Sequence, residues 1–374
     1  MPKNGYSKAE GLISGWVGKI RNNRNFRIIG QGIKILDMNF LIMIGFSLRF
    51  YGNGGNDIDR VKILVENRSI NVGGDFTIEF WMKAYISENN SPNCSSGTGD
   101  LWIYGNIIFD RDVFGNGDYG DYGISVAGGK IAFGVNRLGN GFTLCGNKNV
   151  ADGSWHHIAL TRRESDGRMR IYVDGQLDAE GFGPSGNIDY RSGRTTDYPN
   201  DIYLVIGAEK HDYDRNFYPS YSGWIDEIRV SSIIRYDSPF DPPNTPFSLD
   251  EDVVALYHLD EGPVGPCTGT VIDATNSNNG FCSYGSVDKP AGPIYSIEDP
   301  FSTKNYEILN DLKINKHYIY STQNKTMEIE IYDKFGRLVI SRTIENGIKV
   351  NIKKLKSGVY ILRVNKNKII KFIK

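Results

Sequence analysis

The chain has 374 residues, and a length of this order predicts about two domains rather than one. It contains 43 glycines, 22 tyrosines and 18 phenylalanines, a usage that favours short strands joined by tight turns. No segment repeats apolar residues with a sustained 3.6-residue period, so the sequence favours an all-β protein over a helical one.

The formal net charge of −1 hides an uneven distribution of charge. Residues 301–374 contain 16 Lys or Arg and 6 Asp or Glu, a net charge of +10, and the preceding 300 residues carry a net charge of −11. This division predicts two units with different functions. The basic residues of the tail alternate with apolar ones, as on the solvated face of a sheet, so we expect no nucleic-acid partner.

Residues 1–46 form a poorly defined N-terminal extension. Residues 1–45 are polar and rich in Gly and Asn, and the apolar run at residues 40–46 is too short to span a membrane. The order of segments that marks a secretory signal peptide is not visible. We therefore predict no transmembrane segment, and the sequence indicates either a misassigned start or a fragment of a longer protein.

From residue 47 onward the apolar residues alternate as they do in half-buried strands. In residues 76–83, for example, Phe76, Ile78 and Phe80 share one face with Met82. Many short one-sided strands can bury their apolar faces only by packing in two layers. Residues 47–289 are therefore predicted to form a two-sheet antiparallel jelly-roll sandwich. The expected strands are residues 47–50, 76–83, 106–109, 122–126, 130–135, 155–161, 168–173, 202–206, 224–230 and 253–259.

All four cysteines lie in the acidic part of the chain. None forms a C-x-x-C pair, and no His lies at the spacing of a zinc site, so a structural zinc ion is not expected. Of the three pairings that four cysteines allow, we favour Cys94–Cys145 and Cys267–Cys282. The alternative is four free thiols in a cytosolic protein.

A Pro- and Ser-bearing stretch without alternation, residues 290–304, predicts a linker. Residues 305–374 follow with short alternating segments, such as Met327, Ile329 and Ile331, separated by turns. They predict a small C-terminal immunoglobulin-like β-sandwich.

Five ordered motifs, FTIEFW, WHHIALT, IYVDG, WIDEIRV and ALYHLDEG, begin at residues 76, 155, 171, 224 and 255. With them the chain resembles LamG-like jelly-roll domains of the concanavalin A-like superfamily. The resemblance implies a binding or adhesion module, often for carbohydrate, with a glycan or a surface protein as ligand. The alternative that it leaves open is a glycoside hydrolase or polysaccharide lyase of the same superfamily.

The segments EIYDKFGRLV, LKSGVYILRV and the terminal KFIK resemble the type A C-terminal sorting domain of the type IX secretion system. This resemblance implies that residues 305–374 engage the secretion machinery and that the protein reaches the outer-membrane surface or exterior of a Gram-negative bacterium. A Pro-Asn-Pro element is usual where this chain has Glu298, Asp299 and Pro300. The alternative is an accessory immunoglobulin-like domain without a sorting function.

Catalytic motifs are not evident. Glycosidases of this fold place two carboxylates on one strand in an E-x-D-x-x-E pattern, whereas Glu79 stands alone on its strand. Neighbouring pairs such as Asp260 and Glu261 would face opposite ways. The sequence has no G-x-S-x-G motif, and packing explains the His156-His157 pair better than catalysis does. We therefore predict no enzymatic activity.

Related sandwiches often hold one structural Ca²⁺, which needs six to eight oxygen ligands. Alternation places Asp226 on the same face as Trp224 and Ile228, an unusual position for an unpaired carboxylate. We name Asp226 and Asp57 as candidate ligands. The alternative is that Asp226 accepts backbone N–H groups.

Two further polar regions are candidates for binding. Acidic residues in a Gly-rich loop could hold a cation, although they resemble an EF-hand loop in composition only. The competing interpretation is a solvated turn. The residues are Asp110, Asp112, Asp118 and Asp121. Aromatic residues gather in the polar stretch 189–221. Sugar binding needs an exposed ring beside amides or carboxylates, and the alternative is that these rings cover a sheet edge. The residues are Tyr198, Tyr203, Tyr213, Phe217, Tyr218 and Tyr221.

Overall fold

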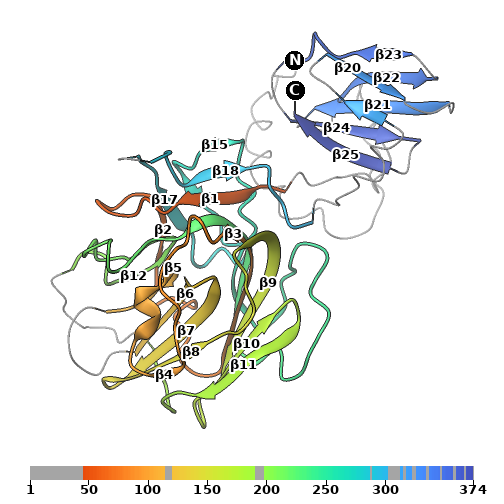
Figure 1. The fold of residues 1–374 in the computed structure, drawn as a ribbon. Helices are drawn as coiled ribbons and strands as arrows, with labels where there is room; N and C mark the ends of the chain where they lie inside the picture. The colour runs from red at the N-terminus through yellow and green to blue at the C-terminus, as the bar shows by residue number, and fades with distance from the viewer. Residues whose placement is uncertain are drawn as a thin grey trace, which may run out of the picture. The chain divides into compact units, whose positions relative to one another are not determined.

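The computed structural model describes most of the chain from residue 45 onward (Figure 1). The described residues are 45–113, 120–189, 198–286, 289–301, 312–314, 317–321, 326–333, 337–345, 348–356, 359–365 and 368–373. The predicted N-terminal extension, apart from Gly45 and Phe46, lies outside them. In the part of the chain that is described, no helix has the length and apolar character needed to span a bilayer.

The first of two large sheets has the strand order β11-β10-β9-β3-β13-β1-β18-β15, with β14 paired to β13. Each neighbouring pair in it is antiparallel. Its strands are β1 (Ser47–Tyr51), β3 (Phe76–Tyr85), β9 (Asp152–Arg162), β10 (Arg168–Val173), β11 (Gln176–Phe182), β13 (Ser222–Ser231), β14 (Val253–Tyr257), β15 (Gly265–Pro266) and β18 (Ile294–Ser296).

The second large sheet has the order β16-β17-β2-β12-β5-β6-β7-β8-β4 and is also antiparallel. One 3₁₀ helix, η1 (Leu101–Tyr104), precedes β5. The strands are β2 (Arg60–Leu64), β4 (Gly97–Thr98), β5 (Asn106–Asp110), β6 (Gly120–Ala127), β7 (Lys130–Arg137), β8 (Asn140–Cys145), β12 (Tyr203–Ile206), β16 (Thr270–Val271) and β17 (Gly280–Ser283).

The hydrophobic core lies between these two sheets. Phe76, Ile78, Phe80 and Met82 of β3 are all buried in it, so the predicted alternation is confirmed for this strand. Phe80 meets Phe109 of β5 with ring centroids 5.0 Å apart, which joins the two layers. The all-β fold class and the two-sheet sandwich are therefore as the sequence predicts.

The outer face of the first sheet is covered by residues 232–252, which follow β13. Tyr236 of this segment donates a hydrogen bond to Glu79 Oε2 at 2.9 Å. Arg229 and His157 contact the same carboxylate at 2.8 and 3.1 Å, and Glu79 is fully buried. This cover explains why polar residues that alternation places outside are nevertheless buried.

A β-bulge in β13 changes the side-chain phase that we predicted for Asp226. Asp226 pairs with Trp81, but Arg229 rather than Ile228 pairs with Glu79, and Glu227 between them has a φ of 48°. An extra residue of this kind shifts the following side chains to the other face. Asp226 therefore faces outward, and Ile228 lies in the core, so the prediction that they share a face is wrong.

The sandwich continues into the segment that we predicted to be a linker. β18, Ile294–Ser296, pairs with β1 and belongs to the first sheet. The predicted boundary at residue 289 is therefore too early, because a three-residue strand is too short to show alternation.

The C-terminal unit consists of two small antiparallel sheets with the orders β19-β20-β23 and β22-β21-β24-β25. Ile329 and Ile331 of β21 are buried in its separate core, as their alternation predicts. The strands are β19 (Leu312–Ile314), β20 (Tyr318–Ser321), β21 (Met327–Asp333), β22 (Leu338–Ile344), β23 (Lys349–Asn351), β24 (Val359–Val364) and β25 (Lys368–Ile373).

Candidate functional site

Four aromatic residues from two segments form an exposed cluster beside the second sheet, which we call the tyrosine patch: Tyr104, Tyr213, Phe217 and Tyr218. The rings of Tyr104 and Tyr218 stack with centroids 5.8 Å apart and an interplanar angle of 21°. Tyr213 meets Tyr218 at the same centroid distance. Tyr104, Tyr213 and Phe217 are 44%, 62% and 65% exposed. Such large rings left open to solvent are available to a ligand.

η1 carries Tyr104 and lies on the outer face of the second sheet. Trp102 of η1 is buried over Gly123 of β6 and Gly134 of β7, where an added Cβ would overlap the indole ring. Ser125 donates a hydrogen bond to the Trp102 carbonyl at 2.6 Å. Only glycine allows an indole to approach two strands so closely, which fixes where η1 sits.

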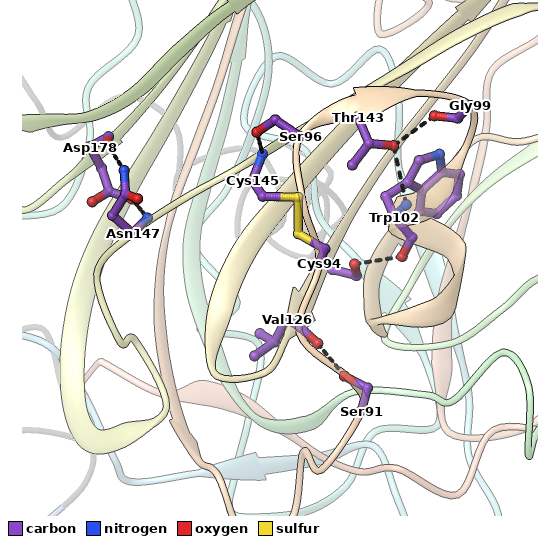
Figure 2. Close-up of a disulfide and its surroundings, with 11 residues drawn as sticks. Ser91, Cys94, Ser96, Gly99, Trp102, Val126, Thr143, Cys145, Asn147 and Asp178 are labelled. Carbon is purple, nitrogen blue, oxygen red and sulfur yellow. Dashed lines mark hydrogen bonds between the residues drawn. A yellow bond between two sulfur atoms is a disulfide. The ribbon is translucent and has the colours of Figure 1, made fainter.

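The Cys94–Cys145 disulfide ties the segment before η1 to β8, with the two Cα atoms 6.1 Å apart. Figure 2 shows it beside Trp102 and Thr143. Thr143 donates to the Gly99 carbonyl at 2.9 Å and accepts from Trp102 N at 3.3 Å. The disulfide and these hydrogen bonds together hold the Tyr104 side of the patch.

The loop at residues 207–220 supplies the other three rings. The backbone N–H groups of Phe217 and Tyr218 both donate to the Asp214 carbonyl at 2.9 Å, which forms a tight turn. Tyr213 N donates to Glu209 Oε2 at 2.9 Å, and Ile107 N of β5 donates to the Pro219 carbonyl at 2.8 Å. The loop is therefore fixed at both ends.

Beneath this loop lies a buried network of charged groups. His211 contacts Asp201 at 2.5 Å and Glu209 at 3.0 Å. Burial lowers the pKa of His211, but its hydrogen bonds to these two carboxylates more than compensate and raise the pKa to about 9. Burial raises the pKa of Asp110 to about 7, although the Lys210 ammonium opposes the shift. The network sets the charge and the position of the loop.

The acidic loop predicted from the sequence is only partly brought together. Asp110 and Asp121 are buried. Burial raises the pKa of Asp112, and the Glu209 charge adds to this shift. Burial and then the Asp112 charge raise the pKa of Asp121. Asp118 lies outside the described residues. Lys210 has its ammonium among these carboxylates, so the cluster is partly neutralised within the protein.

The aromatic residues that we singled out from sequence have different fates. Tyr213, Phe217 and Tyr218 are in the patch, whereas Tyr221 is fully buried. Tyr198 meets His211 edge-on at 5.2 Å, and Tyr203 lies against Phe281 at 5.8 Å. Sequence reasoning missed Tyr104, which lies about a hundred residues before the other three rings of the patch. The one sequence signal for Tyr104 is its closeness to Cys94, whose disulfide holds this segment.

The two calcium candidates do not meet. Asp57 pairs with the Lys62 ammonium at 3.0 Å and accepts from Asn200 at 3.2 Å. Burial raises the pKa of Asp226 well above its usual value, and the charges of Glu227, Asp260 and Asp299 raise it further. Asp57 and Asp226 thus have different neighbours.

Carboxylates supply the hard oxygens that Ca²⁺ prefers, and those of Asp260 and Asp299 lie near Asp226. Within the described ranges, however, no three His, Cys, Asp or Glu side chains are grouped so as to hold a metal ion. Backbone carbonyls would have to complete a site at Asp226.

The structure contains the second disulfide as well, Cys267–Cys282, with Cα atoms 5.7 Å apart, so both pairings are those that we favoured from the sequence. None of the cysteines is free.

Together these features define the class of molecule: a jelly-roll β-sandwich with an open aromatic patch on one sheet, followed by a small second β-unit. Residues 54–236 match the model of the concanavalin A-like lectin/glucanases superfamily, and residues 310–374 match that of the secretion system C-terminal sorting domain. The chain therefore carries a concanavalin A-like domain and a C-terminal sorting domain, as the sequence motifs indicate, and the sorting domain implies secretion to the cell surface or exterior.

Among curated proteins, the rat and mouse forms of a sushi, von Willebrand factor type A, EGF and pentraxin domain-containing protein are 34% identical over 84 residues. The match covers 22% of this chain and 2% of the length of those relatives.

Three solved structures are similar to this chain at low identity. A Bacteroides ovatus protein suggested to bind carbohydrate is 18% identical, with a TM-score of 0.39 and coverage of 69% of this chain and 63% of its own. A heptameric SAP-like pentraxin of Limulus polyphemus is 15% identical, with a TM-score of 0.36 and coverage of 52% and 80%. Mouse laminin α1 domains LG4-5 are 11% identical, with a TM-score of 0.34 and coverage of 88% and 77%.

Proposed function

We propose that the protein is a secreted, non-catalytic binding module that recognises a glycan through the tyrosine patch. The observation that carries this proposal is the stacked Tyr104–Tyr218 pair with Tyr213 and Phe217 open beside it. Sugar rings present C–H faces that pack on aromatic rings, while their hydroxyl groups need polar partners.

Polar partners are close to the patch. Glu209 and Asp112 lie near enough to Tyr218 for their charges to raise the pKa of its phenol, after burial and the two neighbouring tyrosines. Asp100 directly precedes η1, and its carboxylate accepts a hydrogen bond from the Asn136 amide at 2.8 Å. Carboxylates and amides at the edge of an aromatic surface can fix the orientation of sugar hydroxyls.

Catalysis has less support. Glu79 is buried and held by Arg229, His157 and Tyr236, so it is part of the packing of the first sheet. The raised pKa of Asp110, about 7, would suit a general acid, but the carboxylate is fully buried beneath the Lys210 segment. The proposed module therefore binds its ligand unchanged.

The test uses affinity gels containing laminarin, xylan, galactomannan or starch. We expect retardation of the wild-type chain by at least one of them, and Tyr218→Ala should abolish it. Phe182→Ala is the matched control, because Phe182 is 59% exposed on β11 of the other sheet. Equal retardation of wild type and Tyr218→Ala, or release of reducing ends from the gel polysaccharide, would overturn the proposal.

We also propose that Asp226 helps to hold one Ca²⁺. The support is a buried carboxylate whose pKa is raised by burial and then by the negative charges of Glu227, Asp260 and Asp299. A cation would relieve the cost of burying them. Asp57 has no part in this proposal, because Lys62 already pairs with it.

A further inference from the structure

A second group of side chains lies on the outer face of the second sheet, toward its β17 side, with Lys62 buried among more open neighbours. We call it the lysine patch: Asp57, Lys62, Tyr203 and Phe281. The rings of Tyr203 and Phe281 meet edge-on, with centroids 5.8 Å apart. The Lys62 ammonium lies 4.8 Å from the Tyr203 ring and 5.5 Å from the Phe281 ring. Phe281 is 41% exposed, and the Asp57 carboxylate that pairs with Lys62 is also open.

Strand register shows how far Phe281 of the lysine patch lies from the strand position beneath η1, the helix that carries Tyr104. Phe281 pairs with Lys62, Lys62 with Val205, Val205 with Asp110, and Asp110 with Gly123. These pairs cross four strand spacings, which at ~4.8 Å each amount to about 19 Å. Gly123 lies directly under Trp102, two residues before Tyr104. A single sugar is much shorter than this interval, whereas a chain of several sugars can span it.

The loop that carries the tyrosine patch also reaches the lysine patch. The Asp212 carboxylate accepts from Arg60 Nη2 at 2.6 Å and from Asp57 N at 2.8 Å. Tyr213, the next residue, contacts Tyr218 and is 62% exposed. The loop at residues 207–220 thus links the two patches, and carboxylates, an amide and exposed rings lie along it.

We propose that the lysine patch is a second contact region for the same glycan, so that the domain selects extended polysaccharide chains over short oligosaccharides. The inference rests on the proposed function. Asp57 and the Asn200 amide, which donates to Asp57 at 3.2 Å, would meet sugar hydroxyls, and Phe281 would supply the apolar contact.

The experiment measures how affinity depends on chain length. The polysaccharide that binds in the gel panel is hydrolysed to trimers and octamers, and calorimetry gives their dissociation constants. We expect Phe281→Ala to weaken octamer binding about tenfold, equivalent to ~1.4 kcal/mol, and to leave trimer binding unchanged. Tyr218→Ala should weaken both lengths, and the control Phe182→Ala should weaken neither.

Two outcomes separate the inference from the proposed function. If Phe281→Ala leaves octamer binding unchanged, or weakens trimers and octamers equally, the second region is wrong while the tyrosine patch stands. If Tyr218→Ala has no effect, or no polysaccharide of the panel binds, both proposals fail. Phe281→Tyr keeps a ring at this position and should keep octamer affinity, which distinguishes a lost contact from a disturbed strand.

Discussion

Near the tyrosine patch, the loop at residues 207–220 contains charged side chains that are largely buried. Lys210 is fully buried, with its ammonium donating to the carbonyls of Asp201 and Tyr203 at 3.2 and 3.1 Å. His211 next to it is held by two carboxylates. Buried charges of this kind are stable only when paired, so the loop above them depends on their protonation.

His211 gives a prediction for pH. Its pKa in the folded chain is about 9, above the usual value of 6.5 for histidine, so protonated His211 stabilises the fold below pH 6.5, and this contribution disappears as the pH rises through 9. This difference in pKa corresponds to about 3 kcal/mol of stability. Thermal unfolding from pH 6 to 10 should show a falling melting temperature, and His211→Gln should be less stable than wild type at pH 6 but not at pH 10. A constant difference between the two proteins would contradict this account.

Asp226 gives a prediction for calcium. The pKa of Asp226 is raised in the folded chain, so the fold loses stability as the pH rises above the usual pKa of a carboxyl group. When no cation is bound, this loss is still present at neutral pH. In EDTA at pH 7, Asp226→Asn should be more stable than wild type, because the amide removes a charge that burial disfavours. Added Ca²⁺ should raise the melting temperature of wild type but not of Asp226→Asn. Asp57→Asn is the control and should respond to Ca²⁺ as wild type does.

Sequence reasoning at this scale recognised residue types better than their partners. Aromatic residues in a polar loop are conspicuous, so the sequence points to Tyr213 and Tyr218. It does not point to Tyr104, because the stacking partner of Tyr104 is distant in sequence. Alternation places Asp226 on the same face as Ile228, which is wrong, because a one-residue bulge between them is invisible in the alternation. Contacts between distant segments decide these cases.

At the scale of elements, the sequence predicts ten strands of the sandwich but misses others, among them β2, β8 and β11, and it predicts neither of the coverings. β10 begins and ends where alternation places it, and β3 extends two residues further than predicted. The cover of the first sheet by residues 232–252 has no periodic signal, yet it buries Glu79. The same holds for η1, a four-residue helix whose position follows from glycines on other strands.

The disulfide beside η1 gives a prediction for binding. Reducing Cys94–Cys145 removes the crosslink between the η1 segment and β8, so the Tyr104 side of the patch should become less ordered. Replacing both cysteines by serine should lower stability by about 4 kcal/mol for a separation of 51 residues and weaken glycan binding.

The chain provides a matched control for this experiment. Cys267–Cys282 closes a separation of 15 residues, and its removal should cost about 3 kcal/mol. Because Cys282 neighbours Phe281 and not the tyrosine patch, the Cys267/Cys282 double serine variant should keep its affinity for trimers. If both double variants lose trimer binding equally, the loss reflects general destabilisation and the positioning role of Cys94–Cys145 is wrong.

At the scale of the whole molecule, two units differ in charge and in design. The sandwich belongs to the acidic part of the chain, whereas residues 301–374 carry a net charge of +10. The C-terminal sheets have their own apolar core, in which Leu312, Ile329 and Leu362 are fully buried. A unit with its own core can keep its structure when it is moved to another protein.

That independence gives the last prediction, which concerns export. In a bacterium that has the secretion system, the chain is produced behind a signal peptide with and without residues 305–374. We expect the full chain at the cell surface or in the medium, and the truncated chain inside the cell envelope, because the sorting domain is what the secretion machinery engages. The truncated chain should keep its melting temperature and its glycan affinity, which separates a sorting defect from misfolding. A fluorescent protein that carries a signal peptide and residues 305–374 should leave the cell as well. Equal export of the truncated and full chains would show that export does not depend on residues 305–374. The basic C-terminal unit would then have a role other than sorting.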